Sequence, residues 1–290
     1  MLRDSFLVML FILFSAASGF SMAGKIENIP MKPYAKLNLK DGEVLRYKIE
    51  RGGENVSEFK FVIILSNDSQ GRYANIYHDG INVLKNEKYP DEYTNYIARF
   101  LISLDQATLL ENAFGEKSCR TNILPRLDQK TPVTLYKKSV FDRTASEVFM
   151  ESLIQRGGNL EYRKNRIKIK KGYPILDLGS GIVMGVRFLD ITGPGIAIFV
   201  IPEILKEPLP VNFRFLGKEK VSTKAGDFNT IKIGFTVADT FLGQLMRSFT
   251  KETILWLEDS DRRILVKMKS PDNDFVLEEI TNVKTSLLRN

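Results

Sequence analysis

The sequence predicts a mainly β protein: a curled antiparallel sheet, forming an open barrel or a sandwich, with a small helical insert. Short runs rich in β-branched and aromatic residues follow one another along the chain, and Gly, Pro, Asp or Asn separate them. Residues 43–50 alternate apolar with charged side chains, which is the period of a half-buried strand. The sequence shows no internal repeat, low-complexity tract or composition break. We therefore expect one β-rich unit rather than several domains.

The first strands are expected to form an antiparallel meander. Gly52 and Gly53 end the strand at residues 43–50, and strands follow at residues 59–65 and 72–77. Further strands are expected at residues 133–141, 160–163, 196–200, 211–216, 229–237, 253–257, 263–268 and 275–280. Many short strands at such spacing favour a sheet that curls.

The helical insert is expected at about residues 91–115. Apolar residues recur there at helical spacing, and neither Gly nor Pro interrupts them before Gly115. The residues that set this spacing are Tyr93, Ile97, Phe100, Leu101 and Leu104. A second short helix is expected at residues 145–155, and we expect the helices to cover one face or end of the sheet.

The N-terminus has the pattern of a secretory signal peptide at residues 1–23. A polar start precedes the apolar run at residues 6–14, and small residues lead to a cleavage site after Ala23. Because a membrane span needs about 20 apolar residues, this run is short for one, although an uncleaved anchor remains the alternative. We therefore expect a periplasmic protein whose single β-rich domain comprises residues 24–290.

The basic composition of the chain indicates which kinds of partner it can attract. The formal net charge is +7 and the pI is about 9.3, which gives a mild attraction to anions. Outside the cytosol those anions are anionic lipid, lipopolysaccharide or a cell-wall component rather than nucleic acid. The single cysteine, Cys119, has no partner for an internal disulfide, so stability must come from packing. The sequence does not set the oligomeric state.

Two motifs near the C-terminus carry a family resemblance. The first reads Phe213-Arg214-Phe215-Leu216-Gly217-Lys218-Glu219, followed by Val221-Ser222-Thr223-Lys224-Ala225-Gly226-Asp227-Phe228. The second is a hairpin with Trp256-Leu257-Glu258-Asp259 and Arg262-Arg263. Over residues 206–280 the chain resembles the exported bacterial domain-of-unknown-function family numbered three-one-zero-eight. Its opening strand is similar to Asp41-Gly42-Glu43-Val44-Leu45-Arg46-Tyr47.

The resemblance implies an exported, mostly antiparallel curled sheet and brings no established chemistry. The family often has a proline after the arginine pair, where this chain has Ile264-Leu265. From the residues themselves, Gly226 suits a positive φ at a turn and Phe228 points to the core. Trp256 belongs to the hairpin strand, and Asp259 lies at a polar hairpin tip. We interpret these four as structural residues, with a binding role as the alternative.

Groups for catalysis are few. The only histidine, His78, is expected to be a surface turn residue, because no spacing supports a catalytic partner. A zinc site needs three or four His or Cys ligands, and the chain has two such residues. Carboxylate pairs such as Asp259 with Asp261, or Glu278 with Glu279, are expected to be solvated rather than to cleave glycosides. We expect no catalytic residue, no metal and no cofactor.

The most informative charged segment contains the cations Arg163, Lys164, Arg166, Lys168 and Lys170. In an extended chain Arg166, Lys168 and Lys170 share one face, and the intervening isoleucines share the other. Lysines on an edge strand commonly prevent aggregation between sheets. The alternative is a contact with an anionic envelope component, which makes these five residues the candidate ligand-binding site.

These observations favour a noncatalytic exported envelope protein that binds an amphiphilic or anionic ligand, or docks an envelope partner. One alternative is a carboxylate-based hydrolase of polysaccharide or cell wall, which requires two facing carboxylates in a cleft. Another is a purely structural assembly factor. An internal apolar cavity beside Arg166 and Lys168 would favour the ligand-binding function.

Overall fold

The computed structural model describes most of the chain after the N-terminal segment. The described residues are 30–32, 34–69, 71–82, 93–105, 108–119, 133–142, 146–156, 158–169, 174–177, 180–191, 195–200, 209–237, 253–270 and 273–284. The expected signal peptide at residues 1–23 lies outside them, as does Lys170.

All the described strands belong to one sheet of fifteen strands. The first eight strands are β1 (Glu43–Arg51), β2 (Glu54–Asp68), β3 (Gly71–Asn82), β4 (Tyr93–Ser103), β5 (Thr108–Cys119), β6 (Val133–Asp142), β7 (Glu147–Arg156) and β8 (Asn159–Lys168). The other strands are β9 (Ile175–Asp177), β10 (Gly195–Val200), β11 (Leu209–Thr223), β12 (Gly226–Val237), β13 (Thr253–Glu258), β14 (Leu265–Lys269) and β15 (Asp274–Asn282).

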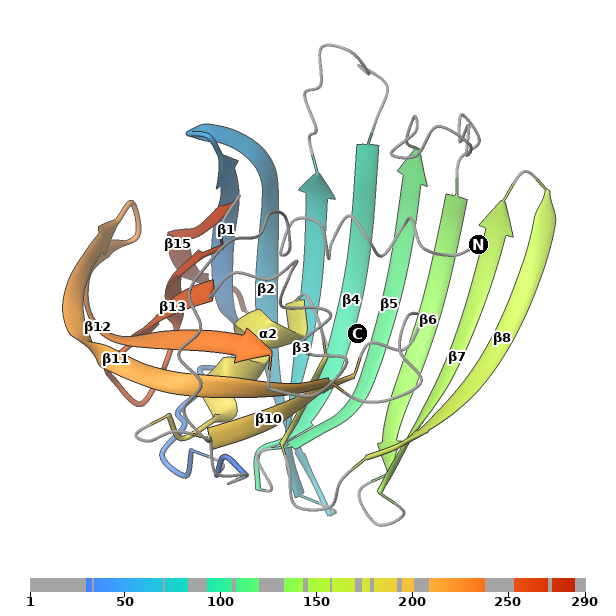
Figure 1. The fold of residues 1–290 in the computed structure, drawn as a ribbon, viewed down its shortest axis with the longest axis horizontal. Coiled ribbons are helices and arrows are strands. Elements are labelled where there is room, and N and C mark those ends of the chain that lie inside the picture. Colours follow the sequence, from blue (N-terminus) through green and yellow to red (C-terminus); the bar gives the residue numbers. More distant parts are fainter. Residues whose placement is uncertain are drawn as a thin grey trace.

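The strand order is β8-β7-β6-β5-β4-β3-β2-β1-β15-β14-β13-β12-β11-β10-β9. Every neighbouring pair is antiparallel except β9 and β10, which are parallel. The two ends of the order, β8 and β9, do not pair with each other within the described residues, so the sheet is curled but not closed. Figure 1 shows long strands β4 to β8 on one side and the curved β11–β12 hairpin on the other. The predicted curled antiparallel sheet is therefore confirmed.

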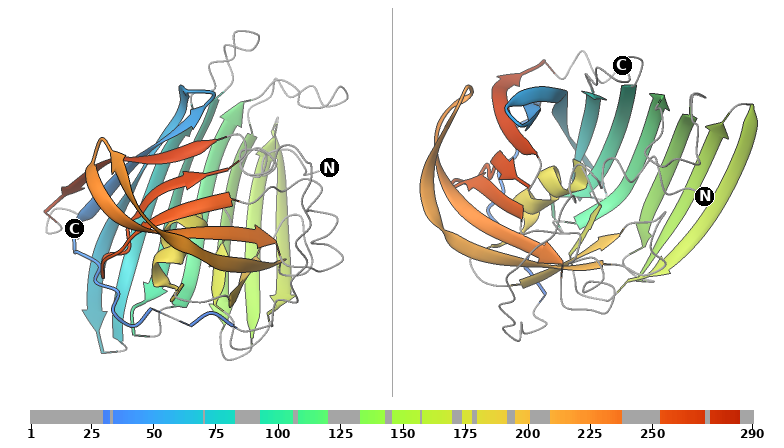
Figure 2. Two further views of the ribbon diagram at one scale, coloured as in Figure 1. Left: turned by 60° about the vertical axis from the view of Figure 1, so that its left-hand side comes forward. Right: turned by 45° about the horizontal axis from the view of Figure 1, so that its top comes forward.

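A short helical segment follows β9 and precedes β10 in the chain, and it lies on the concave side of the sheet (Figures 1 and 2). It consists of α2 (Ser180–Gly185) and the 3₁₀ turn η1 (Val186–Phe188). Its apolar residues and the inward residues of the sheet, such as Phe61 and Ile167, belong to one buried cluster. Because alternate residues of a strand face the same side, the concave face supplies the core and the convex face meets solvent.

The predicted helical insert at about residues 91–115 is wrong. This segment forms strands β4 and β5, and the second predicted helix forms β7. In β4, Ala98, Phe100 and Ile102 are buried on the concave face, whereas Ile97 lies exposed on the convex face. Apolar residues on both faces hide the period of two and imitate a helical spacing. The described helical residues are instead those of α2 and η1.

Candidate functional site

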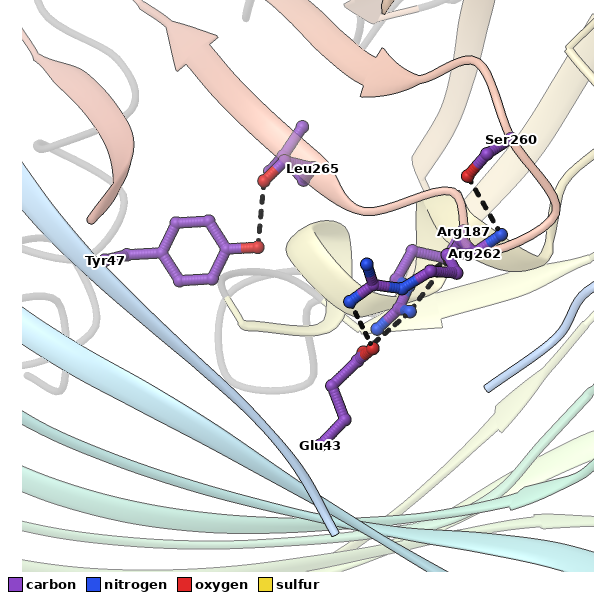
Figure 3. A network of polar contacts seen from close by, with 6 residues as sticks. All are labelled: Glu43, Tyr47, Arg187, Ser260, Arg262 and Leu265. Atoms are coloured by element: carbon purple, nitrogen blue, oxygen red, sulfur yellow. Dashed lines mark hydrogen bonds and ion pairs between the residues drawn. The ribbon is translucent and has the colours of Figure 1, made fainter. Parts of the chain in front are cut away.

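A buried ionic cluster joins three distant parts of the chain (Figure 3). Glu43 is the first residue of β1 and its side chain is fully buried. One carboxylate oxygen accepts a hydrogen bond from Arg187 Nη2 at 3.0 Å, and the other accepts from Arg262 Nη2 at 2.9 Å. Arg187 also donates from Nε and Nη2 to the carbonyl oxygen of Arg262, at 3.1 and 2.8 Å. The cluster therefore connects β1, η1 and the β13–β14 hairpin.

The hairpin between β13 and β14 positions the arginines. The backbone N–H of Arg262 donates to Ser260 Oγ at 3.2 Å, which fixes the turn. Arg263 has a φ of +51°, and its guanidinium group donates to the Leu189 carbonyl at 3.0 Å and lies 4.5 Å from the centre of the Tyr34 ring. Burial lowers the pKa of Arg263, while Tyr34 and nearby carboxylates oppose that shift. The turn directs two consecutive arginines into the interior, where each holds a different partner.

The cluster brings together residues from two motifs that are far apart in the sequence. Glu43 belongs to the opening-strand motif and Arg262 to the tryptophan hairpin, and they are 219 positions apart. Their common partner, Arg187, was not predicted; the available signal was a lone charge in the apolar residues 180–189. Since two guanidinium groups occupy the Glu43 carboxylate, this group is engaged in a structural contact rather than available for chemistry.

His78 does not lie at the surface, so its predicted position is wrong. It occupies the middle of β3, is buried, and stacks on Phe61 with ring centroids 4.3 Å apart. Burial lowers its pKa to about 3, because the interior disfavours the charged imidazolium. The neutral ring therefore belongs to the packed core next to Phe59 and Phe61.

The acidic pairs singled out in the sequence are each engaged with other groups. Asp259 pairs with Lys218 at 2.6 Å, and Asp261 accepts the Tyr34 hydroxyl at 3.0 Å. Glu278 pairs with Lys48, and Glu279 with Arg46. These four carboxyl groups are thus hydrogen-bonded or ion-paired groups at or near the surface.

The described carboxyl groups with a resolved pKa shift are Asp105, Glu151 and Glu219, and in each the pKa is lowered by hydrogen bonds. A glycosidase acid requires the opposite direction. Within the described part of the chain, no group of three or more His, Cys, Asp or Glu could hold a metal ion.

The four predicted motif residues occupy structural positions. Gly226 has a φ of +134° at the turn between β11 and β12, as expected. Phe228 is partly buried against the core, and Trp256 is buried. The Trp256 indole N–H donates to Glu219, and the Lys232 and Lys267 ammonium groups lie 5.3 and 5.9 Å from its ring. Asp259 lies in the hairpin with its ion pair to Lys218.

The predicted basic strand is β8, at one end of the sheet. Arg166 and Lys168 are exposed, whereas Ile167 and Ile169 are buried, so the predicted alternation is confirmed for these residues. Arg163 is exposed on the opposite face from these two cations, because it differs from them by an odd number of positions. Both faces of β8 are thus exposed over residues 159–166, and only its end is anchored, through Ile167 and the following Ile169.

The cations of β8 have acidic neighbours. Lys164 pairs with Glu151 at 3.1 Å, Arg166 pairs with Glu147 at 3.4 Å, and Arg163 pairs with Glu161. The Arg166 guanidinium also lies 4.4 Å from the centre of the Phe149 ring. Ion pairing with β7 offsets much of the positive charge, which weakens the case for a purely electrostatic contact with an anionic surface.

The convex face of β4 to β8 carries a line of exposed apolar side chains that the sequence analysis missed. Register pairs Tyr162 with Leu153, Leu153 with Tyr136, Tyr136 with Gly115, and Gly115 with Ile97. Their exposed fractions are 55% for Tyr162, 37% for Leu153, 51% for Tyr136 and 67% for Ile97. We call these four side chains the apolar row. The sequence indicates such a row only indirectly, because these strands carry apolar residues at odd as well as even positions and therefore on both faces.

A charged row runs beside the apolar row. Register pairs Lys138 with Glu151 and Glu151 with Lys164. Tyr162 donates its hydroxyl to Glu151 at 2.9 Å, so the two rows are also connected to each other. Hydrogen bonds from Tyr162 and Lys164 lower the pKa of Glu151, and the Lys138 charge adds to this effect. The convex face therefore presents an apolar line next to alternating charges.

Among the helices of the described residues, none combines the length and apolar character that crossing a membrane requires.

Comparisons with known proteins find partial likeness to a few solved structures and no family. No family model and no curated protein sequence matches the chain, so the resemblance to the family numbered three-one-zero-eight is not confirmed. One similar structure is a β-barrel-like protein of the domain of unknown function DUF1849 from Brucella abortus, with 8% identity and a TM-score of 0.45. It covers 89% of this chain and 100% of its own.

Two further structures are similar over comparable lengths. A candidate lipoprotein from Parabacteroides distasonis has 11% identity and a TM-score of 0.30, and covers 88% of this chain and 100% of its own. A candidate exported protein with a YmcC-like fold from Bacteroides fragilis has 9% identity and a TM-score of 0.29, with 89% and 100% covered. None of these similarities assigns a function to this chain.

Proposed function

We propose that this chain is a noncatalytic exported protein of the bacterial envelope, periplasmic in location, that docks a partner through the convex face of β4 to β8. The observation that carries the proposal is the apolar row, whose four side chains lie in register on an otherwise solvated face. An exposed apolar line that is interrupted only at Gly115 is typical of an interaction surface, whereas single exposed apolar residues are ordinary.

The composition of this face also fits docking. Tyrosine and arginine are enriched at protein interfaces, because each combines a large contact area with hydrogen bonding. Here Tyr136 and Tyr162 are exposed on the same face as Lys164 and Arg166, and ion pairs with β7 already orient both cations. A partner would therefore meet partly ordered side chains, which lowers the entropic cost of binding.

The concave face offers less for a ligand beside the basic strand. Ile167 and Ile169 point inward there, and both belong to the buried cluster together with Met150 and Val148. These side chains are packed against neighbours rather than lining an opening next to Arg166. The proposal therefore favours docking on the outside over an amphiphile inside, and a protein partner over anionic lipid, lipopolysaccharide or cell wall.

Site-specific crosslinking in the source bacterium tests this function. Benzoylphenylalanine in place of Ile97 lies at one end of the apolar row and should crosslink to a partner on illumination. The combined change Tyr136→Ser, Leu153→Ser and Tyr162→Ser should remove that crosslink. A control alters three other exposed apolar residues elsewhere, Phe215→Ser, Leu216→Ser and Val283→Ser, and should retain it.

Two results would overturn the proposal. One is an equal crosslink yield in the row variant and in the control. The other is a lipid that stays bound to the wild-type protein in native mass spectrometry after purification from the envelope, because this would assign ligand binding rather than docking.

A further inference from the structure

The two edges of the sheet differ in length. The edge strand β9 has three residues, whereas β8 has ten and pairs with β7 without a register shift. Within the described residues, no strand pairs with the outer side of β8. A long, regular edge exposes a row of backbone donors and acceptors that can bind another strand. Natural proteins usually shorten such edges or interrupt them with proline or a bulge, and β8 has neither device.

The charges of β8 decide which strand can pair with it. Its ten residues include four cations, Arg163, Lys164, Arg166 and Lys168, and one acid, Glu161. An antiparallel second copy in full overlap would place Arg163 opposite Lys164, which is destabilising across a sheet, and would place only the single acid Glu161 opposite a cation, Arg166. An acidic strand would instead place an opposite charge against each cation. The edge is therefore more complementary to an acidic segment than to a second copy of itself.

The rows on the convex face extend this argument to individual positions. Across β6, β7 and β8 the charged row reads Lys138, Glu151 and Lys164, with alternating sign. If a further strand paired with β8, an acidic residue opposite Lys164 would continue this alternation of charge. The apolar row ends at Tyr162. An apolar or aromatic residue opposite Tyr162 on such a strand would therefore bury additional apolar surface.

We infer that β8 binds an extended segment of the docking partner as an additional antiparallel strand, with acidic residues opposite Lys164 and Arg166 and an apolar residue opposite Tyr162. This inference rests on the proposed function, because the added strand would continue the apolar row. Backbone hydrogen bonds supply the affinity in this mode of recognition, and the alternating side chains supply the specificity. The partner segment is thus recognised by its pattern of acidic and apolar residues.

A synthetic peptide provides the probe. The fluorescent peptide Glu-Val-Glu-Thr-Glu-Thr-Tyr-Lys-Val places Glu opposite Lys168, Arg166 and Lys164, and Tyr opposite Tyr162, when it pairs antiparallel with β8. Fluorescence anisotropy should show saturable binding to the full mature protein. Binding should weaken as salt is added, because the cross-strand ion pairs are exposed.

N-methylation of the probe distinguishes strand addition from charge attraction. Two versions carry methyl groups on alternate residues, in opposite phases, so that only one version loses the N–H groups directed at β8. Strand addition predicts that one version binds and the other does not. Equal binding of the two versions would overturn the inference, since charge attraction is indifferent to the phase, and so would a failure of the unmethylated probe to bind.

Charge exchange tests the position of the added strand. The combined change Lys164→Glu and Arg166→Glu should weaken binding of the acidic probe about tenfold or more, and should strengthen binding of a probe with Lys in place of its Glu residues. Lys138→Glu, on the same face but two strands from the edge, should leave binding nearly unchanged. If circular dichroism shows that the double variant is unfolded, Lys164→Gln with Arg166→Gln replaces it and should give a smaller loss.

The two proposals fail in different ways. If the benzoylphenylalanine at Ile97 still crosslinks to a partner while the probe does not bind, docking stands and strand addition is wrong. If the crosslink is absent from Ile97, the proposed function itself is wrong. A concentration-dependent dimer that Lys164→Glu with Arg166→Glu alters, seen by sedimentation equilibrium, would assign β8 to a second copy and would likewise overturn the inference.

Discussion

Two groups of cations in this protein use the same chemistry in opposite surroundings. Arg187 and Arg262 meet at a fully buried carboxylate, whereas Lys164 and Arg166 form ion pairs on the solvated face of the edge strand. In both groups a strand holds the acid, and in both the hydrogen-bonding distances are ordinary. The two groups differ in their access to water. Removal of one partner leaves an unpaired, unsolvated charge at the buried site, whereas water solvates the remaining charge at the exposed site.

The comparison separates stability from recognition. The buried Arg187 and the partly buried Arg262 hold β1, η1 and the β13–β14 hairpin together, so both guanidinium groups are already engaged at the Glu43 carboxylate. The edge cations contribute little to stability, because water screens them, and they remain able to form new pairs. The second group is recognisable in the sequence as a candidate site, whereas the first is a structural cluster that only the structure reveals.

The largest expected effect comes from removing the acid of each group. Glu43→Ala leaves Arg187 and Arg262 without their carboxylate, and should lower the free energy of unfolding by about 3 to 5 kcal/mol. Glu151→Ala removes an acid that also binds two side chains, Tyr162 and Lys164, but in water, and should lower the free energy of unfolding far less than Glu43→Ala. Urea unfolding of both variants measures the difference, and equal losses would contradict the comparison.

An intermediate effect on stability is expected from the protonation of His78, a buried side chain that is neutral rather than charged. Its pKa of about 3 in the folded protein lies below the ordinary value of 6.5, so the unfolded chain binds the proton first as the pH falls. Stability should therefore be retained above about pH 6.5 and decline below it, by about 2 kcal/mol between pH 7 and pH 5.

His78→Leu should flatten this decline, as urea unfolding at pH 7 and pH 5 would reveal. Asp105, Glu151 and Glu219 do not interfere, because their lowered pKa values place their losses below the ordinary carboxyl range, under pH 5. An unchanged slope in the leucine variant would show that His78 does not govern stability in this window.

The smallest expected effect concerns the edge itself. Lys164→Gln should leave the melting temperature nearly unchanged, because its pair with Glu151 is exposed to solvent. Differential scanning calorimetry in low and high salt measures it, and the small difference between variant and wild type should vanish in high salt. A large, salt-independent loss of stability would place Lys164 among the structural cations instead.

Local patterns explain why parts of the fold could be predicted. The alternation at residues 43–50, the isoleucines of β8 and the turn at Gly226 each depend on a few neighbouring residues, and each appears in the structure. The helical insert failed for a local reason as well. Ile97 and Leu101 face outward while Phe100 faces the core, so apolar residues on both faces concealed the strand.

The curled, mostly antiparallel sheet and the alternation of exposed cations with buried isoleucines at residues 166–169 follow from the sequence, because side-chain alternation is a property of each strand alone. That β8 is an edge follows only from the folded structure, since the strand order depends on all the pairings together. The fold also brought Glu43 to Arg187 and Arg262, and aligned Tyr136, Leu153 and Tyr162. Contacts between residues far apart in sequence arise when the chain buries its apolar surface, and the local spacing of residues does not encode them.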